Sequence, residues 1–386
     1  MSGNDIPNTK KRKWVVLALL LVAFAIIAYI VVSLITGTGF IQLPNLFSSR
    51  ASEITVGEFN FDVGRNRSFA RMDRSVAAVG TLGVQVLDNE GNETLRDSFR
   101  MTQPAIISSG GRCIAFDIGG TSIRVFNASQ VTASIETDGR IVSASINRNG
   151  WFCVVTQDVG GFRGNVTVYN GMGLDVYRVN IGSGYIVSAQ LSPDNKNLVI
   201  HSLIDTGSRV TFYRDIDTEV DPYHMYDLYD ELIIDIMYLP NGDVLAISTD
   251  SLVLISSNIG SIELYSFFDK RLGGYTFDGE FIALHIYDFG VGFHGRLVSL
   301  DMDGSILKEV TTDWELISMS AVDKSLVILK GDGLSFYNEE LEVFPVSANS
   351  LSAAGANRVL AVGDGIAVAT SDNSAVVLVR EEPPEE

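Results

Sequence analysis

The chain has 386 residues, 46% of them hydrophobic, and a formal net charge of −19. This length fits two ordinary domains or one large all-β domain, and the apolar content is sufficient for a large core. The acidic balance excludes an extended nucleic-acid groove, which needs a basic face, so no nucleic-acid partner is expected.

The N-terminal region contains one long apolar segment. Trp14 to Ile35 comprises 22 residues without a charge. At 1.5 Å per residue such a helix is about 33 Å long, which exceeds a hydrocarbon core of about 30 Å. A cleaved signal peptide is the alternative, but its apolar region is usually about 7–15 residues long and ends in a small-x-small site. The segment therefore predicts a transmembrane helix over residues 14–35, with the Trp14 ring at the membrane interface.

Basic residues predict how this anchor is oriented. Residues 1–13 form a basic tail with four positive charges directly before the helix: Lys10, Lys11, Arg12 and Lys13. Residues 36–64 contain Arg50 as their only basic residue. Because cytoplasmic flanks are enriched in Lys and Arg, we expect a single-pass protein of the cell membrane with a cytosolic N-terminus and an extracytoplasmic remainder. Residues 36–53 read as a linker and residues 381–386 as an acidic tail.

A sequence repeat dominates the rest of the chain. IVSASI begins at Ile141 and IVSAQL begins at Ile186, 45 residues later. Pairs of apolar strands joined by a Gly- or Asp-bearing turn recur eight times, with first strands that begin near Ser75, Arg112, Trp151, Asn197, Asp243, Glu280, Ser325 and Arg358. One more short strand precedes most pairs and another follows, which gives four strands per 33–46 residues without a helical period. This arrangement is typical of β-propeller blades.

We therefore predict an all-β fold, a β-propeller over residues 54–380 with eight four-stranded blades, and keep seven blades as the alternative. A pair of β-sandwiches ranks lower because it predicts no fixed period of about 40 residues. An extra strand, EITVGEFNFDV from Glu53, is a candidate to close the ring by pairing with the last blade. We expect small residues in the crowded innermost strands: Ser143, Ala144, Ser188, Ala189, Ser352 and Ala353.

One blade carries a recognisable motif. LSPDNKNLVIHS, from Leu191 to Ser202, resembles the SPDGK strand-turn-strand of WD40-like and TolB-like propellers, although the Trp-Asp dipeptide of WD40 blades is missing. The tryptophan-rich docking pattern of quinoprotein repeats is missing as well, since Trp151 and Trp314 are the only tryptophans of the predicted domain. The layout of basic start, single anchor and propeller resembles a group of membrane-anchored propeller proteins of unknown function in Gram-positive bacteria. That resemblance implies an architecture and assigns no site residue.

Motifs for catalysis or metal binding are not found, and no catalytic, cofactor-binding or metal-binding residue is predicted. The four histidines have no metal-ligand spacing, and there is no nucleophile elbow or Walker loop. His201 and His285 lie in apolar strands, where we expect buried histidines with satisfied hydrogen bonds. Acidic turns at Asp88, Ser192 and Asp301 invite a calcium interpretation, but a full calcium loop with its bidentate Glu is absent, so turn chemistry is favoured.

The two cysteines occupy corresponding strands of neighbouring blades. Cys113 is two residues past Gly111, whereas Cys153 is three residues past Gly150. With the two-residue period of a strand, their side chains should face opposite sides. We therefore expect two free buried thiols, although an extracytoplasmic location would permit a disulfide.

Aromatic residues in loops are the candidates for partner binding. Two similar segments, GGFRGN from Gly160 and VGFHGR from Val291, are expected to form long loops between second and third strands. A third segment, RDIDTEVDPYHMYDLYDE from Arg214, is expected to connect two blades. The residues predicted to bind a partner are Phe162, Arg163, Phe293, His294, Tyr223, Tyr226 and Tyr229. Exposed aromatic residues are enriched in interfaces, and the alternative is that these rings pack on their own blades.

The sequence therefore favours a membrane-tethered, non-enzymatic propeller that binds a protein or a polymer of the cell envelope. An extracytoplasmic hydrolase or lyase with carboxylates at the mouth of the central channel is the alternative. A sensor that signals through the short cytosolic tail ranks last.

Overall fold

The computed structural model describes residues 58–381, apart from residues 74, 89–90, 219–220, 257–259, 291, 348–352, 364 and 373. The chain divides into two compact units, Met1–Glu53 and Ile54–Glu386, and the described residues all belong to the second. The predicted basic tail, transmembrane helix and linker lie outside the described residues. Within the described ranges, no helix is long and apolar enough to cross a membrane.

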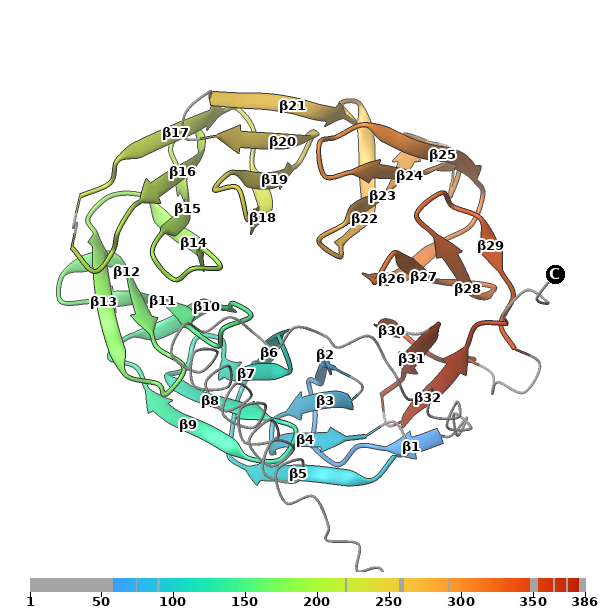
Figure 1. Cartoon of the computed structure of the whole chain (residues 1–386), viewed down its shortest axis with the longest axis horizontal. Coiled ribbons are helices and arrows are strands. Elements are labelled where there is room, and N and C mark those ends of the chain that lie inside the picture. The colour runs from blue at the N-terminus through green and yellow to red at the C-terminus, as the bar shows by residue number, and fades with distance from the viewer. Residues whose placement is uncertain are drawn as a thin grey trace, which may run out of the picture. The chain divides into compact units, whose positions relative to one another are not determined.

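The second unit consists of eight antiparallel four-stranded sheets, arranged as the blades of a β-propeller (Figure 1). Blades 1–4 contain, from the innermost strand outwards, β2 (Ser68–Met72), β3 (Ser75–Gly80), β4 (Gly83–Leu87) and β5 (Glu93–Ser98); β6 (Pro104–Ser109), β7 (Arg112–Asp117), β8 (Ser122–Asn127) and β9 (Val131–Glu136); β10 (Arg140–Ile146), β11 (Phe152–Val159), β12 (Phe162–Tyr169) and β13 (Asp175–Ile181); β14 (Tyr185–Leu191), β15 (Leu198–Ile204), β16 (Gly207–Tyr213) and β17 (His224–Tyr229). Blades 5–8 contain β18 (Ile233–Tyr238), β19 (Val244–Ser248), β20 (Ser251–Ser256) and β21 (Gly260–Ser266); β22 (Lys270–Phe277), β23 (Phe281–Asp288), β24 (Gly295–Asp301) and β25 (Ile306–Thr312); β26 (Leu316–Val322), β27 (Ser325–Lys330), β28 (Gly333–Asn338) and β29 (Val343–Phe344); β30 (Arg358–Gly363), β31 (Ile366–Thr370), β32 (Ser374–Val379) and β1 (Glu58–Asn60). The prediction of eight blades is confirmed.

The ring is closed by strands from the two ends of the described chain. β1 pairs antiparallel with β32, in a register that places Glu58 opposite Val376 and Asn60 opposite Ser374. The predicted closing strand is therefore confirmed over Glu58–Asn60. β1 supplies the outermost strand of blade 8. The last predicted strand pair, β30 and β31, therefore forms the first and second strands of its blade instead of the second and third. The strand that begins at Arg358 is innermost in its blade, whereas the corresponding strands of the other blades are second.

The hydrophobic core lies between the blades rather than within them. Eight clusters of buried residues are present, and each one joins two neighbouring blades. The alternation along β7 shows how: Cys113 packs towards blade 1, and Ile114 packs towards blade 3. Each blade therefore buries both faces of its sheet, one against each neighbouring blade. This explains why the second and third strands are short apolar runs.

The innermost strands are also joined by polar contacts. Ser143 Oγ donates a hydrogen bond to the Val187 carbonyl oxygen at 2.7 Å, and Ser145 Oγ donates one to the Ala189 carbonyl oxygen at 2.6 Å. The predicted small residues on β10 and β14 are thus confirmed as innermost. The prediction is wrong for Ala353, which lies in the connection before β30, and Ser352 is outside the described residues.

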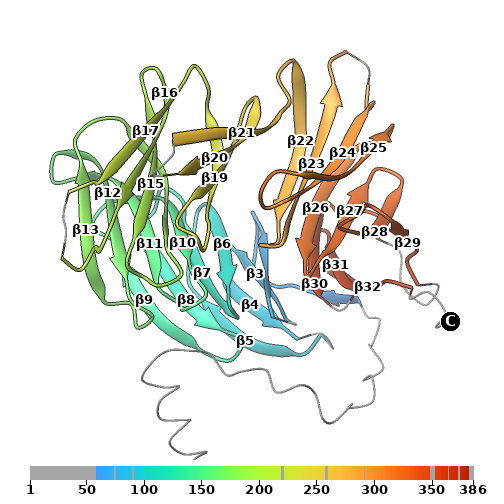
Figure 2. The same cartoon turned by 45° about the horizontal axis from the view of Figure 1, so that its top comes forward.

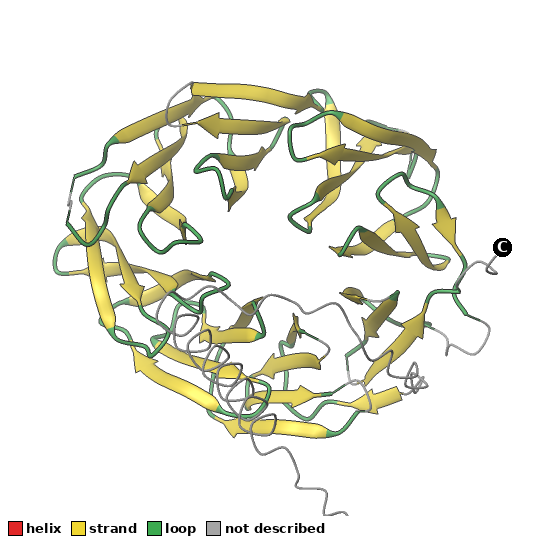
Figure 3. Cartoon of the chain, in the orientation of Figure 1, coloured by secondary structure: helices red, strands yellow, loops and turns green. Residues whose placement is uncertain are grey.

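The two ends of the strands define two faces of the ring. One end carries the blade-to-blade connections and the hairpin loops between second and third strands, and we call it the connection face. The opposite face carries the remaining hairpin loops. Figure 2 shows the strands of each blade running between the two faces, and Figure 3 shows the loops that join them.

Candidate binding face

The connection face carries all the exposed aromatic side chains of the described residues. Six residues of blades 3–6 form this aromatic patch: Phe162, Tyr185, Tyr229, Phe268, Phe289 and Phe293. Phe268 and Phe289 are 67% and 64% exposed. Among the described loops of the opposite face, the large exposed hydrophobic residues are Met172 and Leu174. Aromatic residues are therefore concentrated on one face, which is typical of an interaction surface.

The first predicted segment lies in blade 3 and contacts blade 4 through the Arg163 side chain. Gly160 and Gly161 form a two-residue turn with φ of 59° and 84°, a conformation that favours glycine at both positions. Phe162 and Arg163 are the first residues of β12, so the expected long loop is wrong for this blade. Arg163 donates a hydrogen bond to the Tyr185 hydroxyl at 2.9 Å and lies over its ring at 5.2 Å. This contact holds Tyr185 at the start of β14.

The second predicted segment forms a longer loop between β23 and β24. Phe293 is exposed and lies 6.3 Å from the Tyr287 ring, centroid to centroid. His294 Nδ1 is 2.6 Å from Asp313 Oδ1, and His294 Nε2 is 3.6 Å from Asp288 Oδ2. Lys270 donates a hydrogen bond to Asp288 at 2.5 Å, which lowers the pKa of that carboxyl group. His294 thus connects blade 6 to the connection that leads into blade 7.

The third predicted segment does not connect two blades, because it lies within blade 4. It joins β16 to β17, and the three tyrosines then follow the outermost strand from one face to the other. Tyr223 is at the opposite face, under the Arg214 guanidinium at 4.2 Å. Tyr226 is half-buried and hydrogen-bonds the Ser261 hydroxyl. Tyr229, which is 65% exposed, is the member of this group that reaches the connection face.

Three members of the aromatic patch were missed by sequence reasoning. Phe289 lies in the same loop as Phe293, and a longer reading of YDFGVGFHG would have included it. Phe268 lies in a short blade-to-blade connection, where it follows a buried Phe267, and Tyr185 is the first residue of β14, directly after the turn GSG. Neither one has a sequence signal that separates it from a strand residue.

None of the eight innermost strands begins with an acidic residue at the connection face. At the connection face the first residues of these strands are Ser68, Pro104, Arg140, Tyr185, Ile233, Lys270, Leu316 and Arg358. Within β18, burial raises the pKa of Asp235. The Asp235 carboxylate accepts hydrogen bonds from Tyr275 and from the Ile236 amide rather than facing a second carboxyl group.

The two buried histidines differ in their hydrogen bonding. His285 Nε2 is 3.0 Å from Thr312 Oγ1, and the ring stacks on Trp314 with centroids 4.6 Å apart, whereas its Nδ1 has no partner among the described residues. Neither ring nitrogen of His201 has a hydrogen-bond partner among the described residues, so the prediction of a satisfied histidine is wrong there. Desolvation lowers the pKa of both residues to about 4, which keeps them neutral at physiological pH.

The cysteines are buried free thiols, as predicted. Cys113 packs between blades 1 and 2, whereas Cys153 packs between blades 3 and 4, so the two side chains point away from each other. Burial raises the pKa of Cys153 to about 12 and raises that of Cys113 as well.

The acidic turns use their oxygens within the chain. Asp301 Oδ1 accepts hydrogen bonds from the amides of Asp303 and Ser305, at 3.0 Å and 2.8 Å. Asp88 Oδ1 accepts one from the Asn92 amide at 2.8 Å. The interpretation as turn residues is confirmed for these two turns. In the described part of the chain, no group of three or more His, Cys, Asp or Glu side chains is placed to hold a metal ion.

The described strands form an eight-bladed β-propeller, and its exposed aromatic residues lie on one face. Residues 52–342 match the family of unknown function DUF5711, and the chain belongs to that family. No curated protein matches the chain.

Two solved structures with a similar fold are the C-terminal WD40 domain of Sif2 and BamB from Moraxella catarrhalis. The Sif2 domain is 13% identical with a TM-score of 0.58, and the match covers 85% of this chain and 98% of that one. BamB is 12% identical with a TM-score of 0.51, and the match covers 84% of this chain and 98% of that one. At these identities the likeness extends to the fold alone.

Proposed function

We propose that this propeller is a non-enzymatic binding module that takes a partner protein on its connection face. The main support for this proposal is the aromatic patch, which contains the exposed aromatic side chains of the described residues and lies on blades 3–6. Exposed aromatic rings supply large contact areas with little loss of side-chain entropy, and they are enriched among the residues that dominate binding.

Acidic residues around the patch indicate the chemistry of the partner. The exposed acids of the connection face on blades 4–7 include Asp205, Asp230, Asp269, Asp313 and Glu315. Asp313 is paired with His294, while the others make no ion pair within the described residues. A partner surface with apolar side chains bordered by Lys or Arg would complement this arrangement.

The predicted anchor would place the module at the outer side of the cell membrane. The uncharged segment over residues 14–35 and the preceding basic run support this proposal. A membrane-impermeant maleimide tests it, because Cys113 and Cys153 are buried and leave an introduced thiol as the target. Asp5→Cys should be labelled only after cell lysis, and Asp303→Cys in the exposed β24–β25 turn should be labelled in intact cells. The reverse pattern would contradict the orientation.

Proximity labelling tests the binding surface. A peroxidase fused after the acidic tail should tag one or two abundant neighbours in the native host when biotin-phenol and hydrogen peroxide are added outside the cell. The double variant Phe268→Ala/Phe289→Ala should lose them, since both rings are exposed and their removal leaves the core intact. Met172→Ala, on the opposite face and 72% exposed, is the matched control and should keep them. Unchanged labelling with the double variant would exclude the patch, and the absence of any specifically tagged protein would favour a polymer partner.

A further inference from the structure

The innermost strands of five consecutive blades carry a β-bulge at the same place, near the connection face. Along β18, Ile233 and Asp235 lie opposite consecutive residues of β19, so Ile234 between them is an extra residue without a partner there. β2 and β6 pair with their neighbours without such a shift. Because a bulge redirects side chains, blades 3–7 present residues at the inner rim of the ring that a regular strand would not (Figure 1). The equivalent bulged residues of the other four strands are Val142 on β10, Val187 on β14, Gly273 on β22 and Ile317 on β26.

Hydrogen bonds hold neighbouring bulges side by side. Asp235, directly after the bulge of β18, accepts one from the Tyr275 hydroxyl of β22 at 3.2 Å. Leu316, directly before the bulge of β26, donates its amide to the Tyr287 hydroxyl of blade 6 at 2.7 Å. The bulges of blades 5, 6 and 7 therefore follow one another along the inner rim.

Two of the bulged side chains are apolar and exposed. Ile234 is 46% exposed and Ile317 is 42% exposed. Leu232 in the connection before β18 and Phe268 in the connection before β22 are exposed as well. We call these four residues the apolar rim. Since Phe268 is also a member of the aromatic patch, the apolar rim extends that patch towards the centre of the ring.

Acidic residues accompany the apolar rim. The three connections that precede β18, β22 and β26 contain five acids and no basic residue. Two of these acids are engaged, since Glu231 accepts a hydrogen bond from Ser251 at 2.8 Å and Asp313 pairs with His294 at 2.6 Å. The exposed acids whose side chains make no ion pair or hydrogen bond among the described residues are Asp230, Asp269 and Glu315.

The basic residues at the start of β22 are engaged within blade 6. Lys270 donates a hydrogen bond to Asp288 at 2.5 Å. The Arg271 guanidinium lies over the Tyr287 ring at 4.3 Å. The charges of Asp230, Asp269 and Glu315 therefore remain available to a partner.

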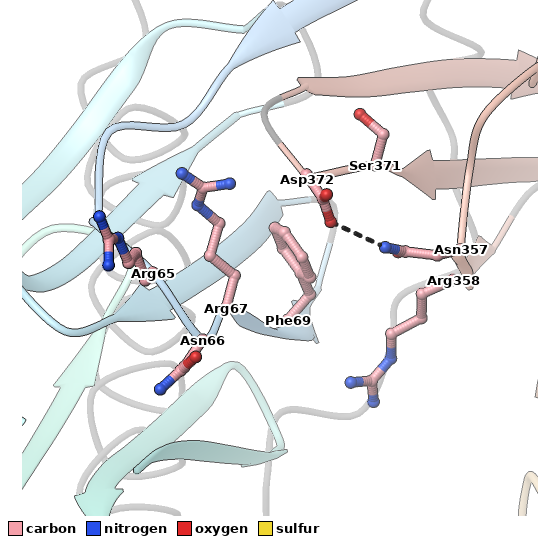
Figure 4. A pocket seen from close by; sticks show the side chains of 8 residues that line it. All are labelled: Arg65, Asn66, Arg67, Phe69, Asn357, Arg358, Ser371 and Asp372. Carbon is pink, nitrogen blue, oxygen red and sulfur yellow. Dashed lines mark hydrogen bonds between the residues drawn. The ribbon is translucent and has the colours of Figure 1, made fainter. Parts of the chain in front are cut away.

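The far side of the connection face has the opposite charge. A cavity of about 670 Å³ opens there between blades 8 and 1, and three arginines and one aspartate are among the residues that line it. Figure 4 shows Arg65 and Arg358 pointing to opposite sides of this cavity. A basic partner would be repelled by this side and attracted by the acids of blades 4–7.

We propose that the apolar rim and its acids bind a basic amphipathic segment of the partner protein. Apolar side chains of the segment pack on Leu232, Ile234 and Ile317, and its Lys or Arg side chains pair with the exposed acids beside them. The inference rests on the proposed function, because it specifies the partner of the same face.

Fluorescence anisotropy with a labelled helical peptide of Leu and Lys in an amphipathic pattern tests the proposal. The full-length chain is held in phosphatidylcholine nanodiscs, and empty nanodiscs give the blank. Ile234→Ser/Ile317→Ser should bind about tenfold more weakly than the parent, because two apolar contacts are lost. Ile262→Ser/Ile306→Ser is the matched control on outermost strands, where both side chains are about half exposed, and should bind as the parent does. Equal losses in the two double variants, or binding no stronger than to empty nanodiscs, would overturn the proposal.

The acids provide a second test that leaves the apolar residues in place. Asp230→Asn/Glu315→Gln should weaken binding several-fold and make it less sensitive to salt, because two charge pairs are lost. Asp303→Asn in the exposed β24–β25 turn should leave binding unchanged. A peptide with Glu in place of Lys should not bind. Equal binding of the two peptides, or no effect of the acid variant, would contradict the role of the acids.

Proximity labelling separates this inference from the proposed function. If the peptide does not bind the rim but Phe268→Ala/Phe289→Ala still loses the tagged neighbours, the basic segment is excluded and the binding face stands. If that variant keeps its neighbours, the proposed function itself fails.

Discussion

Phe59 of β1 lies opposite Ala375 of β32, so the backbone pairing that closes the ring joins the two ends of the described chain. The Phe59 ring packs against Phe61 at 5.9 Å and belongs to the core cluster between blades 8 and 1. Closure covers the edge of β32 and completes the fourth strand of blade 8, so this blade keeps only the short outer edge that every blade has. One short strand therefore holds the first and last blades together.

Removal of the Phe59 side chain should weaken this closure. Phe59 is 9% exposed, and Phe59→Ala should lower the free energy of unfolding by about 3–5 kcal/mol. Glu58→Ala, one residue away with an exposed side chain, should change it by no more than about 0.5 kcal/mol. Urea denaturation followed by circular dichroism measures both variants. Equal effects of the two substitutions would show that β1 does not pack as described.

The thiols should be inert in the folded protein. Cys113 and Cys153 are both buried, and burial raises the pKa of Cys153 to about 12, so little thiolate is present at pH 8. A colorimetric thiol reagent should detect no cysteine before denaturation and both cysteines afterwards. A peptide crosslinked between residues 113 and 153 in an unreduced mass map would disprove this.

The buried histidines should make the fold sensitive to acid. Their folded-state pKa of about 4 lies below the value near 6.5 of an unfolded chain, so the unfolded state binds more protons between these limits. Their contribution to stability is complete above about pH 6.5 and is lost as the pH falls towards 4, by up to about 3 kcal/mol for each histidine.

The variant His201→Leu isolates one of these contributions. It should lose less unfolding free energy between pH 7 and pH 4.5 than the parent, because a buried group that takes up a proton on unfolding has been removed. Urea denaturation at a series of pH values measures the difference. The same pH dependence in parent and variant would exclude His201 as a source of acid sensitivity.

The hydrogen bonds between innermost strands should contribute to stability individually. Ser145→Ala removes the bond to the Ala189 carbonyl oxygen and should cost about 1 kcal/mol. Ser108→Ala, on the innermost strand of blade 2, is the matched control, since the Ser108 side chain makes no hydrogen bond among the described residues. Thermal unfolding of the two variants compares them. An equal shift for both would mean that the Ser145 bond adds nothing net.

Local pattern predicted the propeller and parts of its connection face. The strand pairs that begin near Ser75 and Ser325 repeat because every blade must bury both sides of its sheet. Each blade therefore has its own pair of apolar strands. The side-chain period of a strand correctly placed Cys113 and Cys153 on opposite sides. The role of Asp301 as a turn residue could also be predicted from the sequence, because its hydrogen bonds involve residues close in sequence.

The tyrosines of β17 show where local pattern fails. Tyr223, Tyr226 and Tyr229 look alike among acids in the sequence, but the strand distributes them from one face of the ring to the other. Their different exposure depends on packing against Phe212 and Ser261, which come from other strands. The sequence gives no register between strands, so it could not separate the three.

The sequence by itself determined the strand repeat, the turn residues and the direction of the core side chains, because each of these depends on neighbours a few residues away. The tertiary structure alone decided which distant residues meet. Pairing of β1 with β32 brings Arg65 and Arg67 to the same cavity as Arg358. It likewise decided that Phe162, Phe268 and Phe289 share one face, because curvature of the ring and the register of its strands place their blades.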